Sequence, residues 1–174
     1  QHLGLPITRT ISIGNAAVLN EADYLEYLRD DPDTSVIVMY LEGVRDGRRF
    51  AKLLREVTKV KPVIIWRGGR TKAGAKAAQS HTASLASDDA IWDALLRQAG
   101  AISADSLEEA LDVLQCIVRL PRSSKRGLAL IAMTGGQSVA ITDQFEKGGF
   151  DVPELEQKSY DKLAEFFVTI GGSF

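Results

Sequence analysis

The chain has 174 residues, of which 45% are apolar and 25% charged, and its formal net charge is −2. This balance is typical of a soluble globular protein and argues against a general nucleic-acid binder, which carries a clear excess of basic residues. No apolar run approaches the roughly 20 residues of a membrane-spanning helix. The single cysteine, Cys116, excludes an internal disulfide and favours a reducing, cytoplasmic setting. The first residue is Gln1, and we expect a fragment of a longer protein.

Short β-rich runs alternate with amphipathic helices along the first 120 residues. The expected strands are Thr10–Ile13, Ser35–Tyr40, Pro62–Trp66 and Ala101–Ser103. The expected helices are Glu21–Asp30, Gly47–Lys59, Asp88–Ala99 and Ser106–Leu120. The alternation predicts βα units with right-handed crossovers, and therefore an α/β fold with a parallel sheet and helices on both faces. The last of these helices contains Cys116 in an apolar run, which predicts a buried thiol.

A polar, basic segment at residues 121–126 (PRSSKR) is typical of a linker. A second βα pattern follows it, with an expected strand, turn, helix, short strand and helix. These elements are Gly127–Met133, Thr134–Gly136, Gln137–Lys147, Asp151–Val152 and Ser159–Phe167. This pattern has too few strands to close a sheet, so residues 127–174 are expected to begin a second, incomplete domain.

The segment between the third expected strand and the next helix carries the strongest chemical signal. It contains four basic residues and no acidic residue before Asp88: Arg67, Arg70, Lys72 and Lys76. In parallel sheets ligands bind at the carboxyl ends of strands, and a basic, small-residue loop there suits a phosphorylated ligand. His81 lies in this loop, and a neutral imidazole can carry a phosphoryl group. The residues alone leave open a solvated surface loop with an ordinary histidine.

Three further places are candidate site residues. Glu42 follows the second expected strand, where it is either a catalytic carboxylate or an ordinary surface or capping group. Gly14 and Asn15 form a plain turn signal. Gly135, Gly136 and Gln137 join a strand to a helix start, where backbone N–H groups can bind an anion, although many such turns bind nothing.

Several segments resemble the acyl-CoA synthetases that form a nucleoside diphosphate, a family that includes ADP-forming acetyl-CoA synthetase and is related to succinyl-CoA synthetase. The matching segments are SIGN, YLEG, GGRTKAGAKAA and KAAQSHTASLASDDAIWDALLRQAGAI, which run from about Ile11 to Leu114. The resemblance implies that residues 1–120 form a flavodoxin-like domain that lacks its first βα unit. It also implies that His81 is phosphorylated and that Glu42 accepts a hydrogen bond from the other ring nitrogen.

The resemblance extends to TGGQSVAITDQFEKGGFDVPEL, which is similar to the start of the family's second flavodoxin-like domain. There the glycine-rich turn, here Gly135, Gly136 and Gln137, helps to hold the phosphorylated loop, and Gly14–Asn15 matches a loop near the same pocket. Two family glycines are replaced, by Ala83 and Ser87. Each replacement puts a stiffer residue at a flexible site of the loop.

The implied reaction interconverts acyl-CoA, phosphate and ADP or GDP with the carboxylic acid, CoA and the nucleoside triphosphate. It passes through an acyl phosphate and a phosphohistidine, and needs CoA, ATP or ADP and Mg²⁺ in the full enzyme but no cofactor or metal in this fragment. The resemblance implies that the CoA-binding and nucleotide-grasp domains lie outside it. We expect no nucleic-acid or membrane partner, and a homo-oligomer stays open.

Other functions remain as alternatives. One is a ligand-sensing, synthetase-like regulatory domain of a protein acetyltransferase, although such a domain needs neither His81 nor Glu42. Another is a non-catalytic assembly domain. A receiver domain that is phosphorylated on aspartate is less favoured, because no acidic cluster lies at the expected strand ends.

Overall fold

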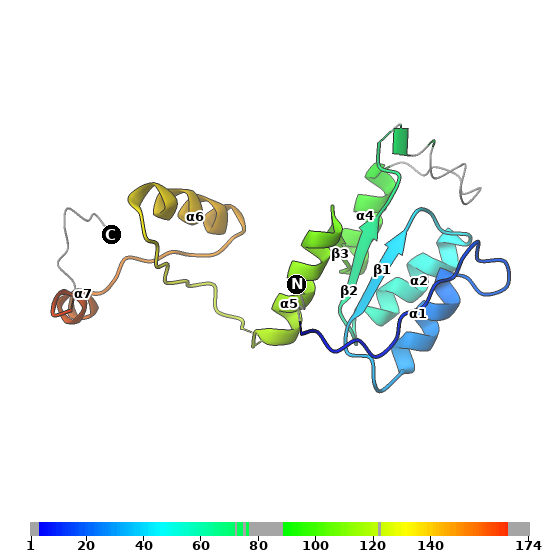
Figure 1. The fold of residues 1–174 in the computed structure, drawn as a ribbon, viewed down its shortest axis with the longest axis horizontal. Coiled ribbons are helices and arrows are strands. Elements are labelled where there is room, and N and C mark those ends of the chain that lie inside the picture. Colours follow the sequence, from blue (N-terminus) through cyan, green and yellow to red (C-terminus); the bar gives the residue numbers. More distant parts are fainter. Residues whose placement is uncertain (1–3, 72, 75, 77–88, 122, 167–174) are drawn as a thin grey trace. The chain divides into compact units, whose positions relative to one another are not determined.

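The computed structural model describes residues 4–71, 73–74, 76, 89–121 and 123–166 (Figure 1). These residues form two units, Gln1–Pro121 and Arg122–Phe174, which we call unit 1 and unit 2. No helix in the described part of the chain combines the length and apolar composition needed to cross a bilayer.

A three-stranded parallel sheet organises unit 1. Its strands are β1 (Ile37–Leu41), β2 (Val63–Arg67) and β3 (Ile102–Ala104), in the order β1-β2-β3. The central strand β2 is apolar on both faces, and its first three residues are fully buried, as expected for a parallel strand covered on both sides. The parallel α/β fold is therefore confirmed. Because the strands run in the same direction, the residues that follow Leu41, Arg67 and Ala104 lie along one edge of the sheet.

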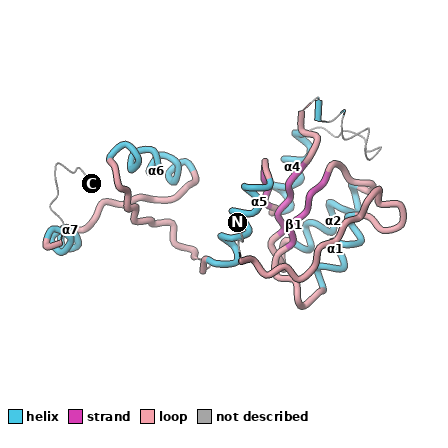
Figure 2. The backbone as a smooth tube through the Cα atoms, viewed as in Figure 1, coloured by secondary structure: helices cyan, strands magenta, loops and turns pink. Residues whose placement is uncertain are grey.

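Helices cover both faces of this sheet, as predicted (Figure 2). The helices α1 (Glu21–Asp30), α2 (Gly47–Val57) and α4 (Asp89–Ala99) share the larger hydrophobic cluster with β1 and β2. On the other face α5 (Leu107–Arg119) packs against β2 and β3 through a smaller cluster. Among the described residues, α5 makes its main contacts with β2 and β3 and leaves side chains of β1 on this face partly exposed.

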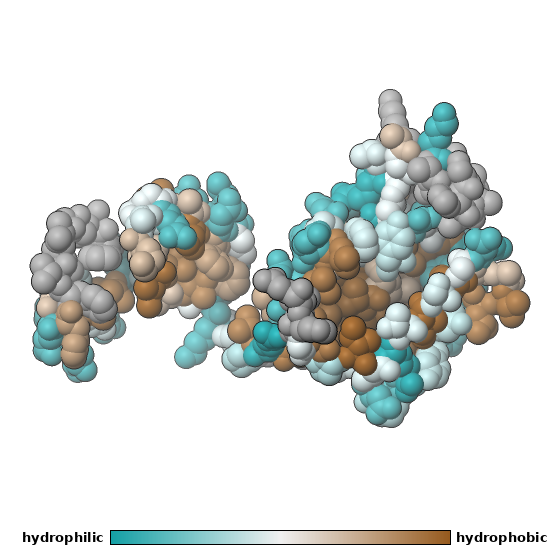
Figure 3. All heavy atoms as spheres, viewed as in Figure 1, coloured by the Kyte–Doolittle hydropathy of each residue, from teal (hydrophilic) through white to brown (hydrophobic). Residues whose placement is uncertain are grey.

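Two side chains of β1 are partly exposed on this face of the sheet. Val38 and Tyr40 are paired in register with Ile64 and Trp66 of β2, so they point to the face of α5. They are nevertheless 42% and 50% exposed. Figure 3 shows apolar residues gathered on unit 1 over the strands.

Local capping explains why the helices begin where the sequence predicts. Asn20 accepts hydrogen bonds from the N–H groups of Ala22 and Asp23, and the Asp23 carboxylate accepts one from the Asn20 N–H. This reciprocal arrangement is a capping box. Asp46 and Ser106 cap α2 and α5 through a single contact each, in which one side-chain oxygen accepts the N–H of Arg49 or of Glu109.

Three expected strands are wrong. Thr10–Ile13 is neither strand nor helix in the structure, and Gly127–Met133 and Asp151–Val152 share only one parallel bridge, between Gly127 and Asp151. A β-prone run becomes a strand only beside a hydrogen-bonded partner, and among the described residues these runs have none along their length. Cys116 is exposed rather than buried, because α5 turns other side chains toward the sheet.

Unit 2 contains the helices α6 (Gly135–Lys147) and α7 (Gln157–Ala164). Both helices were predicted, with boundaries that shift by two to three residues at some ends. No residue between 123 and 166 is buried, although Phe145 and Phe150 pack edge to face with ring centroids 5.7 Å apart. That this unit begins a second flavodoxin-like domain stays a prediction.

Candidate active site at the carboxyl edge of the sheet

The loop predicted to carry the phosphoryl group is described only at its two ends. Residues 77–88, which include His81, and Lys72 lie outside the described residues. The described parts of the loop follow Arg67, the last residue of β2, through residues 68–71, 73–74 and 76, and resume at Asp89, the first residue of α4. Several side chains at the carboxyl edge of the sheet surround these two ends.

Glu42 lies one residue beyond β1 at the carboxyl edge, as the sequence predicts. Its Oε1 accepts a hydrogen bond of 3.0 Å from the Tyr40 hydroxyl. Its Oε2 is buried and has no hydrogen-bond partner among the described residues. A buried carboxylate oxygen without a donor is costly, so this atom is an acceptor available to a further N–H group.

Tyr40 occupies a position between the carboxylate and the end of β2. Its ring lies beside the Trp66 ring, with centroids 4.5 Å apart and planes inclined by 51°. Burial of the hydroxyl, followed by its hydrogen bond to Glu42, raises the pKa of Tyr40 above its ordinary value. The hydroxyl is therefore protonated at neutral pH and available as a donor.

Gly68 provides the space that Tyr40 occupies. Its N–H donates to the Leu41 carbonyl oxygen at 2.9 Å, which continues the pairing of β1 and β2 by one residue. A Cβ atom at this position would meet the Tyr40 hydroxyl and lie 2.9 Å from Cζ of the ring. A side chain at residue 68 would thus displace the tyrosine.

Arg67 joins the two described ends of the loop. Its side chain is 8% exposed, and Nη2 donates to Asp89 Oδ1 at 2.6 Å. The guanidinium carbon lies 4.9 Å from the centroid of the Trp92 ring, a favourable cation–π contact. Nη1 is buried without a hydrogen-bond partner among the described residues.

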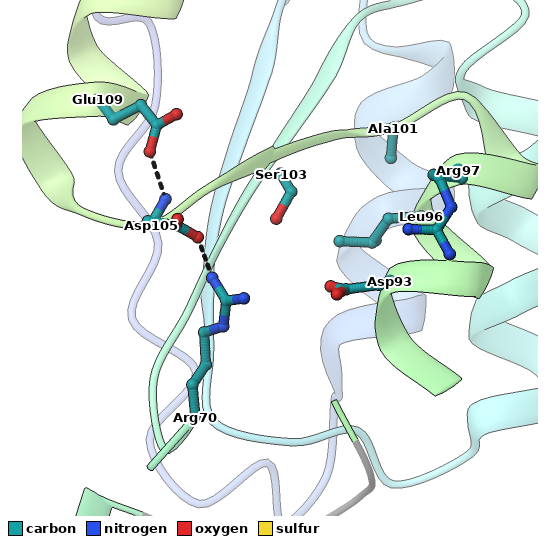
Figure 4. Close-up of a pocket in the computed structure, with 8 residues that line it drawn as sticks. All are labelled: Arg70, Asp93, Leu96, Arg97, Ala101, Ser103, Asp105 and Glu109. Carbon is teal, nitrogen blue, oxygen red and sulfur yellow. Dashed lines mark hydrogen bonds and ion pairs between the residues drawn. The ribbon is translucent and has the colours of Figure 1, made fainter. Parts of the chain in front are cut away.

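Arg70 is paired as well, with Asp105 beyond β3 (Figure 4). Its Nε also lies 3.8 Å from Asp89 Oδ2. It borders a hollow of about 320 Å³ between α4, β3 and α5. The hollow is lined by Arg70, Asp93, Leu96, Arg97, Ala101, Ser103, Asp105 and Glu109. Three carboxylates face two arginines there, so the hollow does not have the positive charge that a phosphate site requires. Arg67 and Arg70 thus both form ion pairs with aspartates.

The predicted turn Gly14–Asn15 lies beside the loop that follows Glu42. Gly14 has a φ of +52°, which glycine adopts without strain. Arg45, three residues after Glu42, donates from Nη2 to the Asn15 carbonyl oxygen at 2.7 Å. The backbone N–H of Arg45 donates to the buried Glu21 at 2.8 Å. The turn and the carboxylate therefore belong to neighbouring segments, and phosphate binding at the turn stays a prediction.

The predicted phosphate loop of unit 2 forms the start of α6. Thr134 Oγ1 accepts the N–H of Gln137 at 3.3 Å and caps the helix. Gly135 and Gly136 occupy the first turn, where backbone N–H groups have no acceptor within the helix. Anion binding by these three residues is compatible with this geometry and stays a prediction.

No group of three or more His, Cys, Asp or Glu side chains in the described part of the chain is arranged to hold a metal ion. The functional contacts that sequence reasoning missed are those of Tyr40, Gly68 and the two arginine–aspartate pairs. The spacing of Tyr40 and Glu42 was a usable signal, because residues two apart along a strand share one face. The contact of Gly68 with Tyr40 and the arginine–aspartate ion pairs join residues far apart in the sequence, so no local sequence pattern indicates them.

Comparisons with known proteins agree with this architecture. The model of the succinyl-CoA ligase like flavodoxin domain matches residues 1–117. The ADP-forming acetate–CoA ligase I subunit alpha of Pyrococcus furiosus is 39% identical over 159 residues, which are 91% of this chain and 33% of that subunit. The ADP-forming 4-hydroxybutyrate–CoA ligase of Nitrosopumilus maritimus is 39% identical over 154 residues, 87% of this chain and 22% of that enzyme.

A solved structure shows the same fold. The dinucleotide forming acetyl-coenzyme A synthetase 1 of Candidatus Korarchaeum cryptofilum, in complex with phosphate and ADP, superposes with a TM-score of 0.81 and 33% identity. The superposition covers 93% of this chain and 35% of that one, so the chain spans about a third of its solved relative. Since the matched domain takes in residues 1–117, well over half of the sequence, the chain belongs to the family of succinyl-CoA ligase like flavodoxin domains.

Proposed function

We propose that this chain is the phosphohistidine-carrying part of an acid–CoA ligase that forms ADP or GDP. His81 is the carrier and Glu42 is the carboxylate that orients its ring. The observation that supports this assignment best is the free acceptor on Glu42. Its Oε2 is buried at the carboxyl edge of the sheet without a donor among the described residues, and the ring N–H of a histidine would satisfy it.

Three transfers make up the proposed reaction. A phosphate oxygen attacks the thioester carbonyl of acyl-CoA, the C–S bond breaks, and CoA leaves as its thiol after taking a proton. A ring nitrogen of His81 then attacks phosphorus in the acyl phosphate, and the P–O bond to the acyl group breaks to release the carboxylate. Finally an oxygen of the nucleoside diphosphate attacks the phosphohistidine, and the P–N bond breaks to give the triphosphate.

Glu42 acts on the second and third transfers. When one ring nitrogen of His81 forms its bond to phosphorus, the imidazole becomes cationic, and the N–H of the other nitrogen is a stronger donor. A fixed carboxylate stabilises that cation and holds the ring in the reactive orientation, as in other carboxylate–histidine pairs. The ion pair of Arg67 and Asp89 keeps the two ends of the loop together.

The binding sites for CoA and nucleotide are assigned to domains outside this chain, and the remaining phosphoryl contacts to residues within it. CoA and the nucleotide are expected on CoA-binding and nucleotide-grasp domains, with Mg²⁺ bound to the nucleotide phosphates. Gly14, Asn15, Gly135, Gly136 and Gln137 are proposed contacts to the phosphoryl group. We place the protein in the cytoplasm, where an exposed thiol such as that of Cys116 stays reduced.

Phosphohistidine mapping of the complete enzyme tests the proposal. Incubation with radiolabelled ATP, or with acetyl-CoA and labelled phosphate, is expected to give acid-labile, base-stable label on His81. The label should disappear in His81→Ala and persist in His2→Ala, which changes the other histidine of the 174-residue sequence. An unlabelled enzyme, or label that survives His81→Ala, would contradict the proposal and favour a regulatory or assembly domain.

A second measurement addresses Glu42. The Glu42→Gln variant keeps the shape of the side chain but removes its charge, so the rate of His81 phosphorylation should fall by about 10- to 100-fold, as for other partners of functional histidines. Glu26→Gln is a suitable control, because Glu26 is an exposed carboxylate on α1.

A further inference from the structure

The two oxygens of the Glu42 carboxylate have different surroundings. Oε1 accepts the Tyr40 hydroxyl at 3.0 Å, and Oε2 is buried without a partner among the described residues. We propose that Tyr40 is a positioning residue that fixes the Glu42 carboxylate for the phosphorylated histidine, and that Gly68 is required because only glycine leaves room for the tyrosine. This inference rests on the proposed function of Glu42.

The contacts of Tyr40 hold its hydroxyl in one place. The residue lies on β1, two positions before Glu42, and its hydroxyl reaches the Glu42 carboxylate just beyond the end of the strand. Its ring packs against Trp66 at a centroid distance of 4.5 Å. Among the described residues, Trp66 and Gly68 are the neighbours that confine the ring.

Gly68 is needed for space and not for backbone conformation. Its φ lies outside the left-handed region, in contrast to that of the next residue, Gly69, at +75°. The backbone of residue 68 therefore accepts any L-residue. A Cβ atom would, however, lie 2.9 Å from Cζ of Tyr40 and closer still to the hydroxyl, a contact that real Cβ atoms do not make.

The arrangement would hold the Glu42 carboxylate in the orientation that accepts an imidazole N–H. A hydroxyl that donates to an ionised carboxylate makes a strong, directional hydrogen bond. With Oε1 held, rotation of the carboxylate is restricted, and Oε2 keeps the direction in which an imidazole N–H must approach. Groups that are held in the reactive geometry before reaction avoid an entropic cost during it.

Substitution of Tyr40 by phenylalanine separates the hydroxyl from the ring. In the complete enzyme, Tyr40→Phe should lower the rate of His81 phosphorylation by about 10-fold, with unchanged KM for nucleotide and CoA and an unchanged melting temperature. Tyr27→Phe is the matched control, because Tyr27 is an exposed tyrosine on α1 that does not contact Glu42, and it should react at the rate of the unmodified enzyme. A lower melting temperature together with a higher KM would mean a merely structural role and overturn the inference.

A double-mutant cycle shows whether Tyr40 acts through Glu42. In a Glu42→Gln background, Tyr40→Phe should change the rate by less than about 2-fold, because the two residues act as one unit. Effects that multiply fully would overturn the inference, as would a normal rate in Tyr40→Phe when Glu42→Gln is slow. A normal rate in Glu42→Gln itself would overturn the proposed role of Glu42, which is a distinguishable failure.

The glycine gives an independent test. Gly68→Ala should slow phosphorylation to about the rate of Tyr40→Phe, and the double variant should be no slower than Tyr40→Phe alone, since the hydrogen bond is then already absent. Gly47→Ala is the control, because a Cβ atom there meets only Val44 at 3.8 Å. A Gly68→Ala enzyme that reacts at the normal rate would overturn the requirement for space.

Discussion

Units 1 and 2 contain the same kinds of local signal, but only unit 1 encloses a core. Both have helices with capped starts, through Asn20 on α1 and Thr134 on α6. In unit 1 these helices bury apolar faces against a sheet, whereas no residue between 123 and 166 is buried. In unit 2 Ile131 is 99% and Met133 94% exposed. The difference shows that helix caps and apolar periodicity define a helix locally. Most of the stability of a folded unit, however, comes from packing the apolar face of the helix against another element.

The largest expected difference comes from removing one phenylalanine in each unit. Phe50 on α2 is fully buried and packs edge to face on Trp92, with ring centroids 6.0 Å apart. Phe50→Ala should lower the free energy of unfolding of unit 1 by about 3–5 kcal/mol, because it removes a large buried ring and leaves a cavity. Phe145→Ala in unit 2, whose ring is 38% exposed, should leave that transition unchanged.

Denaturant unfolding followed by tryptophan fluorescence measures both variants, because both tryptophans belong to unit 1. An equal loss of stability in the two variants would show that unit 2 unfolds together with unit 1. That result would contradict the contrast between the units.

We expect low pH to destabilise unit 1 through protonation of Asp31. This side chain is 4% exposed and accepts hydrogen bonds from Arg9 and from Thr34 Oγ1. Both bonds, that of Arg9 first, hold the pKa of Asp31 well below its ordinary value. A lowered folded-state pKa means that the stabilisation is complete above about pH 4, the ordinary value for an aspartate, and is lost as the pH falls toward the lowered value.

Melting temperatures of unit 1 between pH 7 and pH 2 test this expectation. Asp31→Asn should melt at a lower temperature at neutral pH and show a flatter decline below about pH 4. Asp161→Asn, on α7 of unit 2, should keep the pH profile of the unmodified chain. If Asp31→Asn keeps the same decline in acid, other carboxylates are responsible.

The smallest expected effect concerns the two helix caps. Asn20→Ala removes the side-chain acceptor of the capping box and should lower the unfolding free energy of unit 1 by about 1 kcal/mol. Thr134→Ala removes the corresponding acceptor of α6 and should leave the unit 1 transition unchanged, while the helical circular dichroism signal falls slightly. If Thr134→Ala lowers the stability of unit 1 as much as Asn20→Ala does, the proposed difference between the two units is contradicted.

Much of the site was predictable because it depends on local pattern. The position of Glu42 at the end of β1 followed from the apolar run before it, and α1 begins and ends where its cap and periodicity predict. The ion pairs of Arg67 and Arg70 with Asp89 and Asp105 were not predictable, since each joins residues that are 19 or more positions apart along the chain. In the sequence Arg67 and Arg70 therefore looked like two cations without acidic partners.

The sequence by itself determined the helices, the three paired strands and the order in which they alternate, because caps, turns and apolar spacing act over a few residues. Only the tertiary structure decided which β-prone runs become strands: Thr10–Ile13 is no strand, and Gly127–Met133 makes a single bridge, to Asp151. It also placed Tyr40 against Gly68 and Glu42. The physical reason is the same in each case: a strand or a buried polar contact needs a partner from another part of the chain.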